Sequence, residues 1–420
     1  MNVKSLHTLA FFATVALFAT IVMAQPKMLP SPTDNVGPKE IKIEAESPLW
    51  SPDGTKIAFA RVSRDTGKTD PNFRLLCVVD ASTGNNIEIL AGLSYLPRNF
   101  CWSPDGTKLA FVECTSDGGN IYTIDLATKT KTKLTDSKEH PDNDYLHLAW
   151  SPDGTKIAFT IRQRYSYGQH DCYIWIVDSQ GKFWFKLVKG HMPMWVPDSE
   201  KIIFSAGSID IGEGDFHIID SNGKNLKKVE YPESLPLRGF TNICLSPDSQ
   251  TAFYTNGYEI HATKPNEGQP TATEILAGRS GVVSDIVGIA GTKAAGIKDG
   301  TVSVIDLNKL VAARKTKSKE KLPKAAIVAQ FKVENLSSGN GQELRMQGST
   351  FYRPLWAWSP DGKQAVYVGT DNELWKIGAD GKNQKQLTFE KTRLVEQAKQ
   401  EQKKQQALAD AKLDATLSNK

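Results

Sequence analysis

Short apolar stretches separated by turn-forming residues recur along most of this chain. In the clearest copies an apolar stretch ends at a tryptophan, the phrase Ser-Pro-Asp-Gly follows, and a β-prone stretch such as Lys56–Phe59 comes next. Proline sets φ for the first corner of a turn, the aspartate side chain caps it, and glycine takes the left-handed position. The pattern therefore predicts pairs of antiparallel strands joined by tight turns.

The turn recurs at nearly regular intervals. Its copies start at positions 51, 103, 151, 196, 246 and 359, and the last interval is about twice as long as the others. A degenerate unit over 286–306 falls in that interval, with Ala290–Lys293 in place of the turn. The spacing therefore predicts seven repeat units.

Each unit also contains a third apolar stretch, such as Asn120–Leu126, and a fourth short one, such as Gln386–Phe389. Four short antiparallel strands in a unit of ~45 residues are typical of a propeller blade. We predict an all-β fold, a β-propeller over residues 41–389 with seven blades, and with six as the alternative count. A β-helix would have shorter repeats, and a sandwich would not repeat its turn chemistry at nearly fixed spacing.

Two features of the units bear on how the blades fit together. The tryptophan before each turn is predicted to pack between neighbouring blades, because it recurs at the same place in the unit. In many propellers the first and last units exchange a strand, and Ile41–Glu44 is the candidate for completing the last blade here.

The N-terminus does not follow the repeat. Lys4, the apolar run Leu9–Val22 and the small residue Ala24 form the pattern of a signal peptide over residues 1–24. A retained membrane anchor is the alternative, although the run is short for crossing a bilayer. We therefore expect a periplasmic or secreted protein with no stable membrane span after cleavage.

Three further segments lie outside the regular units. Residues 25–40 are rich in proline and polar residues and are predicted to be a flexible lead-in. Residues 390–420 are rich in lysine, glutamine, glutamate and alanine and are predicted to be a polar helical or disordered tail. The basic stretch Leu310–Lys324, within the sixth unit, is predicted to be an exposed loop.

Charge and cysteine content exclude some classes of function. The formal net charge is +4 and the basic residues are scattered, so the chain lacks the basic face of a nucleic-acid-binding protein. The five cysteines are odd in number and irregularly spaced, which predicts buried free thiols rather than a disulfide framework. None has the spacing of a zinc site, and we predict no cofactor.

The phrase Trp-Ser-Pro-Asp-Gly-x-Lys-Ile-Ala-Phe resembles the WD-like repeat of TolB, the periplasmic component of the Tol–Pal envelope system, over about residues 45–389. The resemblance implies a propeller. TolB also carries an N-terminal α/β domain, for which residues 25–40 leave no room. The same repeat occurs in prolyl-oligopeptidase-type enzymes, but the Gly-x-Ser-x-Gly motif of their hydrolase domain does not occur in this sequence.

Candidate binding residues come from aligning the units on their turns. The first strand of a blade lines the central channel, and several basic residues lie four to six positions before a turn. A cluster of arginine and histidine at the channel mouth would suit an anionic ligand, and two histidines could instead ligate a metal. The alternative is that these residues only hydrate the channel. The candidates are Arg98, His147, His191 and Arg353, with Arg238 slightly earlier in its unit.

Two functions remain open on these observations. We predict a non-catalytic module that binds another envelope or secreted protein or peptide, with no nucleic-acid partner. The alternative is a carbohydrate-active enzyme similar to oligogalacturonate lyases, a resemblance that implies channel histidines holding a metal and an anionic sugar substrate. His147 and His191 would be the metal ligands in that case. Trp184 and Phe185 are predicted either to form a surface patch or to pack between blades.

Overall fold

The computed structural model describes most residues between 41 and 388. The chain divides into two compact units, 1–40 and 41–420, and every described residue belongs to the second. The predicted signal peptide, lead-in and C-terminal tail lie outside the described residues. The described ranges are 41–65, 73–84, 87–93, 100–115, 118–139, 143–164, 170–196, 200–206, 216–228, 242–245, 251–255, 260–263, 274–277, 285–290, 292–298, 301–315, 324–333, 344–346, 349–351 and 356–388.

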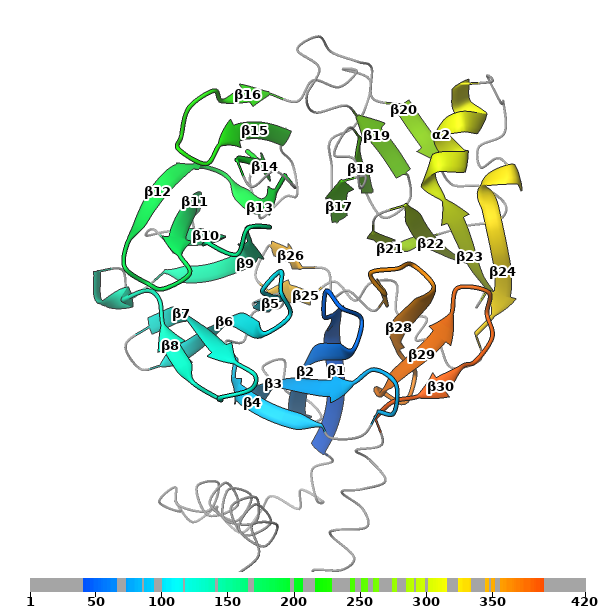
Figure 1. The fold of residues 1–420 in the computed structure, drawn as a ribbon, viewed down its shortest axis with the longest axis horizontal. Helices are drawn as coiled ribbons and strands as arrows, with labels where there is room; N and C mark the ends of the chain where they lie inside the picture. Colours follow the sequence, from blue (N-terminus) through cyan, green and yellow to red (C-terminus); the bar gives the residue numbers. More distant parts are fainter. Residues whose placement is uncertain are drawn as a thin grey trace, which may run out of the picture. The chain divides into compact units, whose positions relative to one another are not determined.

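These residues form seven four-stranded antiparallel sheets and one two-stranded sheet. In each four-stranded sheet the strands are consecutive in the chain and are hydrogen-bonded in chain order. Within this unit the sheets follow one another around a central axis, with fourth strands such as β12, β16 and β24 on the outside (Figure 1). The predicted all-β propeller fold is confirmed, and each four-stranded sheet corresponds to one repeat unit.

The strands have the following bounds. The first sheet contains β1 (Ile41–Trp50), β2 (Lys56–Asp65), β3 (Phe73–Asp80) and β4 (Glu88–Gly92), and the second β5 (Phe100–Trp102), β6 (Lys108–Thr115), β7 (Gly118–Asp125) and β8 (Lys131–Lys133). The third contains β9 (Asp144–Trp150), β10 (Lys156–Arg164), β11 (His170–Asp178) and β12 (Trp184–Lys189), and the fourth β13 (His191–Trp195), β14 (Lys201–Ser205), β15 (Phe216–Asp220) and β16 (Lys227–Lys228).

The remaining sheets continue in the same order. The fifth contains β17 (Asn242–Leu245), β18 (Ala252–Thr255), β19 (Ile260–Thr263) and β20 (Glu274–Ala277), and the sixth β21 (Asp285–Ala290), β22 (Lys293–Lys298), β23 (Thr301–Asp306) and β24 (Ile327–Lys332). The last contains β27 (Trp356–Trp358), β28 (Gln364–Val368), β29 (Leu374–Gly378) and β30 (Lys385–Gln386), while β25 (Leu344–Met346) and β26 (Ser349–Phe351) form the two-stranded sheet.

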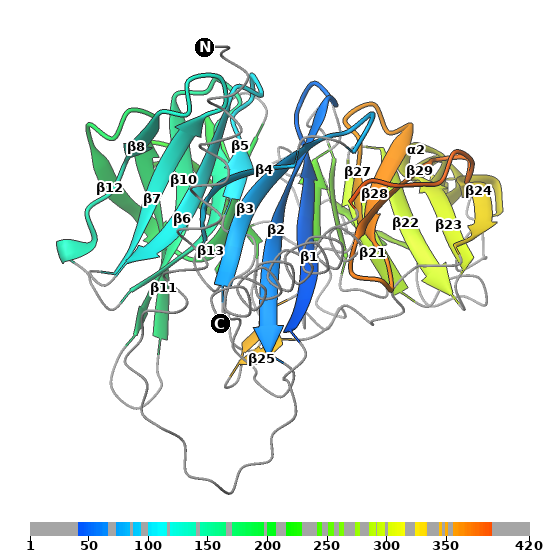
Figure 2. The same ribbon diagram turned by 90° about the horizontal axis from the view of Figure 1, so that it is seen from below.

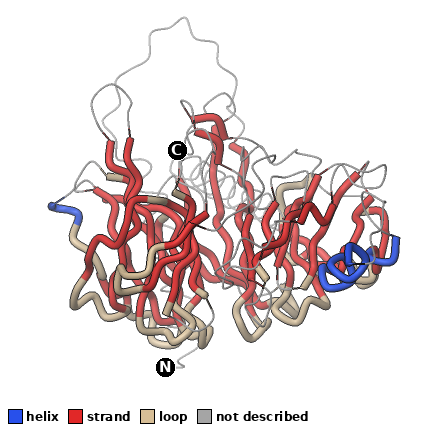
Figure 3. The backbone as a smooth tube through the Cα atoms, turned by 90° about the horizontal axis from the view of Figure 1, so that it is seen from above, coloured by secondary structure: helices blue, strands red, loops and turns tan. Residues whose placement is uncertain are grey.

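Helical segments are few among the described residues (Figure 3). They are η1 (Ser137–Glu139), α2 (Leu307–Lys315) and η3 (Lys324–Ala326). None of the described helices is long and apolar enough to cross a membrane.

The Ser-Pro-Asp-Gly turns have the predicted geometry and an additional role for serine. In the first turn the Gly54 N–H donates to the Ser51 carbonyl at 2.9 Å, and Gly54 has a φ of 71°. The Asp53 carboxylate accepts the Thr55 N–H at 3.0 Å and the Ser51 hydroxyl at 2.5 Å. The Ser51 hydroxyl oxygen also accepts the Lys56 N–H at 2.9 Å, so one side chain joins the two ends of the turn.

Neighbouring sheets pack through apolar side chains and through the tryptophans before the turns. Trp102 packs among apolar residues of the first sheet, including Ala58 and Leu76. Its indole N–H donates to the Leu49 carbonyl of the first sheet at 3.1 Å. Trp195 of the fourth sheet is equivalent, since its indole donates to a carbonyl of β9 at 2.9 Å. The prediction that these tryptophans pack between blades is confirmed for this pair.

The first sheet is complete without help from the end of the chain. Ile41–Glu44 pair with β2, and the last sheet has four strands of its own, so the predicted strand exchange is wrong. The first and last sheets meet instead by lateral packing. The Ala45 N–H donates to the Asn372 carbonyl at 2.9 Å, and the Trp50 indole donates to the Ala357 carbonyl at 3.0 Å. Figure 2 shows β1 with β2 and β3 of its own sheet on one side and β27 and β28 on the other.

The stretch predicted as the exposed loop Leu310–Lys324 is partly helical. α2 covers its first part, and Leu307 and Leu310 are buried with Phe253 and Ile305 in one apolar cluster. The prediction considered the lysines alone, whereas the leucines three positions apart lie on one side of a helix. Residues 316–323 lie outside the described residues.

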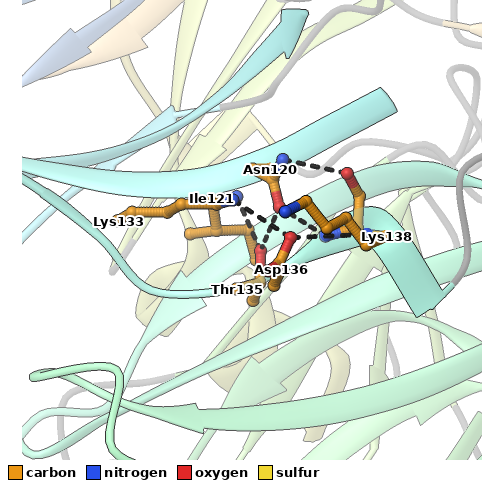
Figure 4. A network of polar contacts seen from close by, with 7 residues as sticks. Asn120, Ile121, Lys133, Thr135, Asp136 and Lys138 are labelled. Atoms are coloured by element: carbon orange, nitrogen blue, oxygen red, sulfur yellow. Dashed lines mark hydrogen bonds and ion pairs between the residues drawn. The ribbon is translucent and has the colours of Figure 1, made fainter. Parts of the chain in front are cut away.

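The connection from the second to the third sheet is held by buried polar contacts (Figure 4). The Asn120 side-chain oxygen accepts the Ser137 N–H at 2.8 Å, and its amide donates to the Ser137 hydroxyl at 2.9 Å. The Ile121 N–H donates to the Thr135 hydroxyl oxygen at 2.9 Å. These bonds satisfy buried backbone groups where the chain leaves β8.

The cysteines agree with the prediction where they are described. Cys77 and Cys172 are buried and Cys101 is partly buried, and none of the three forms a disulfide. The side chains of Cys114 and Cys244 lie outside the described residues.

Candidate functional site

Two of the predicted site residues, His147 and His191, lie beside each other. His147 is in β9, the first strand of the third sheet, and His191 begins β13, the first strand of the fourth. Their ring centroids are 6.3 Å apart and the ring planes are inclined by 39°. The fold therefore brings together two imidazoles that are far apart in the sequence.

Backbone irregularities in the first strands position these rings. His147 has a φ of 52° and Met192, next to His191, a φ of 56°, both in the left-handed region that non-glycine residues rarely adopt. The ladders of β9 and β13 shift register at these points, as in a β-bulge, which redirects side chains. Ser47, with a φ of 53°, occupies the equivalent place in β1. Sequence reasoning did not predict these bulges.

Thr160 of β10 connects the two strands. Its side chain is fully buried, and its hydroxyl oxygen accepts the Met192 N–H at 3.2 Å. The same hydroxyl lies 3.4 Å from Nδ1 of His147. Thr160 therefore links the bulge of β13 to the histidine of β9.

Gly190 sets the approach of β13 to the rest of its sheet. A Cβ atom at this position would lie 2.5 Å from the Phe204 ring, closer than packed atoms approach. The Gly190 N–H donates to the Cys172 carbonyl at 2.9 Å. Glycine is thus required immediately before His191.

His191 is a buried histidine with no hydrogen-bond partner for its ring in the described structure. Its exposed fraction is 4%, and neither Nδ1 nor Nε2 has a partner among the described residues. Burial lowers the pKa of His191 to about 4. The ring is therefore neutral at pH 7, so it can offer a lone pair to a ligand but adds no positive charge.

The three arginines predicted at the channel mouth, Arg98, Arg238 and Arg353, lie outside the described residues. The described part of the chain instead contains two buried ion pairs that sequence reasoning missed. Arg162 of β10 binds the Asp144 carboxylate through Nε at 2.8 Å and through a terminal nitrogen at 2.6 Å. The second pair, Arg74 with Glu46, is also buried. A charged residue opposite another in paired strands was the available signal for Arg162 and Asp144, whereas Arg74 and Glu46 lie on β3 and β1, which are separated by β2.

The donor types of the histidine pair would suit a transition metal, but the pair is not a complete site. Imidazole nitrogens are common metal ligands, and catalytic metal sites have three protein ligands as a rule. Among the described residues no group of three or more histidine, cysteine, aspartate or glutamate side chains could hold a metal ion. The described residues thus offer at most two ligands here.

The repeats and the sheets have a counterpart among known families. Residues 39–205 match the family model described as TolB beta propeller domain. Over these residues the chain is similar to the propeller domain of TolB. The match spans the first three sheets and the first two strands of the fourth, including both histidines. Comparison with curated proteins finds no match.

Solved structures similar to this propeller include enzymes of different kinds. An oligogalacturonate lyase in complex with manganese has a TM-score of 0.53 at 16% identity, covering 79% of this chain and 88% of that one. An oligogalacturonate lyase from Vibrio parahaemolyticus has a TM-score of 0.52 at 15% identity, covering 80% of this chain and 89% of that one. A puromycin-hydrolyzing peptidase from Mycobacterium tuberculosis has a TM-score of 0.53 at 11% identity, covering 82% of this chain and 53% of that one. Likeness at these identities shows the fold alone.

Proposed function

We propose that the protein is an exported, non-catalytic module of the cell envelope that binds another protein or a peptide. The observation that supports this is the contact between successive Ser-Pro-Asp-Gly turns, in which the glycine of one turn faces the proline of the preceding turn. Cβ positions built on Gly54, Gly106 and Gly154 lie 3.8, 3.6 and 3.5 Å from Pro360, Pro52 and Pro104.

The proline, aspartate and threonine side chains of these turns are exposed, and buried serines hold the aspartates in place. The hydroxyl of Ser51 lowers the pKa of Asp53, and the hydroxyl of Ser103 lowers that of Asp105, so both carboxylates stay ionised well below neutral pH. A surface that is ordered before binding loses little conformational entropy when a partner docks. Rigid scaffolds commonly present binding residues on the segments that connect their strands. The row of turns therefore suits a protein or peptide surface.

Site-specific photo-crosslinking in the envelope tests this proposal. A photoreactive amino acid would replace Thr107, which is exposed in the second turn, and Ile89, which is 51% exposed on β4, as the control. We expect a discrete protein adduct from position 107 and none from position 89. The absence of an adduct from position 107 and from the equivalent Thr55 and Thr155 would contradict the proposed surface.

Export is part of the same proposal and rests on the pattern of Lys4, Leu9–Val22 and Ala24. Protein recovered from the periplasm or the medium of an expressing bacterium should begin at Gln25. Recovery of an unprocessed chain in the cytoplasm would argue against export.

A second function, a carbohydrate lyase, is supported by one observation. His191 is buried beside His147 with both ring nitrogens lacking a partner among the described residues, as expected for a side chain that meets a ligand. A metal held there by both rings would supply Lewis-acid chemistry, and Thr160 would fix the orientation of the His147 ring.

The lyase alternative is tested by manganese binding, measured calorimetrically on the purified protein, and by the ultraviolet absorbance of unsaturated products from oligogalacturonate. Replacing His147 and His191 with Ala should abolish both signals if the alternative holds. If the wild-type protein neither binds manganese nor releases product, the non-catalytic proposal stands.

A further inference from the structure

The exposed large apolar side chains of the described residues share one place in the fold. All of them lie on a fourth strand or in the turn that leads to one, at the outer edge of the sheets. They are Ile89 (51% exposed), Phe183 (53%), Phe185 (37%), Leu226 (51%) and Val328 (41%).

Three of the five lie on neighbouring sheets, the third and the fourth. Phe183 and Phe185 belong to the turn before β12 and to β12 itself, and Leu226 precedes β16. A Cβ built on Gly223, in the turn that contains Leu226, would lie 3.8 Å from a methyl carbon of Leu187 in β12. The two segments, 182–189 and 221–228, are therefore in contact at Leu187 and Gly223, and together we call them the outer patch. Figure 1 shows the strands of these segments, β12 and β16, at the outer edge of their sheets.

The outer patch is also basic. Its exposed lysines lie in both segments. Lys189 is paired with the Asp171 carboxylate at 2.6 Å, and two further carboxylates are hydrogen-bonded within the turns. Asp178 is buried and accepts the backbone N–H groups of Gln180 at 2.7 Å and Phe183 at 2.9 Å. Asp220 accepts the side-chain amide of Asn225 at 2.6 Å. The exposed lysines are Lys182, Lys186, Lys189, Lys224, Lys227 and Lys228.

The same bonds fix the direction of the aromatic side chains. Since the Asp178 carboxylate holds the turn at Phe183, the ring remains exposed while neighbouring Trp184 turns inward. Trp184 packs against Trp175, with ring centroids 4.9 Å apart, and against Phe159 at 6.5 Å. The packing expectation therefore fits Trp184, which contacts other aromatic rings, and the surface expectation fits Phe185, which is exposed.

Addition of a partner strand to β12 fits these observations poorly. The ladder between β11 and β12 shifts register between Ile174 and Trp175, and a bulge of this kind interrupts the edge that a partner strand would need. Lysines on an edge strand, here Lys186 and Lys189, also discourage strand pairing. The side chains rather than the backbone are therefore what the outer patch offers.

We propose that the outer patch docks onto an anionic phospholipid surface, a function beyond the proposed protein-binding module. Exposed aromatic and aliphatic side chains can enter the interfacial region of a bilayer, and surrounding lysines are attracted to anionic headgroups. Neither part suffices alone, since a few apolar side chains bind weakly and lysine attraction is screened by salt. The outer patch combines both in two adjacent turns.

Co-sedimentation of the purified exported protein with vesicles tests the proposal. Vesicles of phosphatidylglycerol and phosphatidylcholine would be compared with vesicles of phosphatidylcholine alone, at low and high salt. We expect binding to the anionic vesicles only, weakened at least about tenfold by high salt. Replacing Phe183 and Phe185 with Ser, or Lys182 and Lys224 with Glu, should each weaken it by a similar factor.

The matched control replaces Ile89 and Val328 with Ser, because these side chains are comparably exposed on fourth strands outside the outer patch. This variant should bind anionic vesicles like the wild type, and all variants should unfold at the same temperature. Equal binding to neutral vesicles, or equal loss in the control, would overturn the proposal. So would binding of the outer patch to an acidic protein with no binding to vesicles. Photo-crosslinking at Thr107 is a separate measurement. The protein-binding proposal and the lipid-docking proposal can therefore each fail while the other holds.

Discussion

The indole N–H of Trp102 donates to the Leu49 carbonyl at 3.1 Å across the boundary between the second and first sheets. Trp50 makes the same bond to Ala357 of the last sheet, so the contact recurs where the two ends of the described chain meet. Both tryptophans are buried. At these two boundaries the sheets are therefore tied together by the tryptophan that precedes the turn, and not by exchange of a strand.

Replacing Trp102 with Phe should lower the free energy of unfolding by about 1–2 kcal/mol, because a buried hydrogen bond is lost and part of the indole volume is left empty. Urea unfolding followed by circular dichroism measures the change. Trp150→Phe is the control: its indole is partly buried and bonds within its own turn, to the Gly154 carbonyl at 3.0 Å. An equal effect of both substitutions would contradict the role assigned to the bond between sheets.

The glycines of the two turn types should respond differently to alanine. Gly154 and Gly181 have left-handed φ values of 75° and 73°, so either substitution costs about 1 kcal/mol in backbone strain. At Gly181 the new Cβ would also lie 2.9 Å from the Leu134 Cα of the second sheet, whereas at Gly154 the nearest atom is a Pro104 carbon at 3.5 Å. We expect Gly181→Ala to destabilise by about 2 kcal/mol more than Gly154→Ala in urea unfolding. Similar losses of stability in the two variants would show that the turn between β11 and β12 can adjust to a Cβ atom at position 181.

Arg162 and Asp144 form a buried ion pair, so substitutions at the two positions should have non-additive effects on the free energy of unfolding. Arg162→Met should destabilise by about 3–5 kcal/mol, because it leaves a carboxylate buried without its guanidinium. The double variant with Asp144→Leu should recover a large part of that loss, since both charges are removed. Denaturant unfolding of the single and double variants measures the coupling. Strictly additive losses would mean that the two side chains do not depend on each other.

His191 predicts a loss of stability in acid. Its pKa falls from 6.5 to about 4 on folding, so the unfolded chain binds the proton more readily, and stability decreases as the pH falls from 6.5 towards 4. The full shift corresponds to about 3 kcal/mol. Urea unfolding at pH 7 and pH 4.5 should show a smaller acid-induced loss for His191→Gln than for the wild type.

The control for this experiment is His217→Gln, on β15, where the ring is partly buried and stacks on Phe204 with centroids 5.7 Å apart. It should keep the acid-induced loss of the wild type. If His191→Gln loses as much stability in acid as the wild type does, a ligand or a polar group must contact the His191 ring.

Some structural features of this protein were determined by its sequence alone. The chemistry of Ser51–Gly54 and its repeats is local, since proline, aspartate and glycine each act on the turn that contains them, and so the sheets and their order could be predicted. The degenerate unit was also predicted. Its strands have β-prone residues, although its turn lacks the Ser-Pro-Asp-Gly sequence. The pairing of Ile41–Glu44 was predicted wrongly, since strand partners depend on the neighbouring sheet.

Tertiary structure decided the remaining features, because they depend on side chains from different sheets. The closeness of His147 and His191, and the burial that lowers the pKa of His191, arise where β9 packs beside β13. The outer patch likewise exists because the turn at Gly223 lies against Leu187. Packing between sheets is set by shape and volume across many residues of separation, and no local pattern in the chain encodes it.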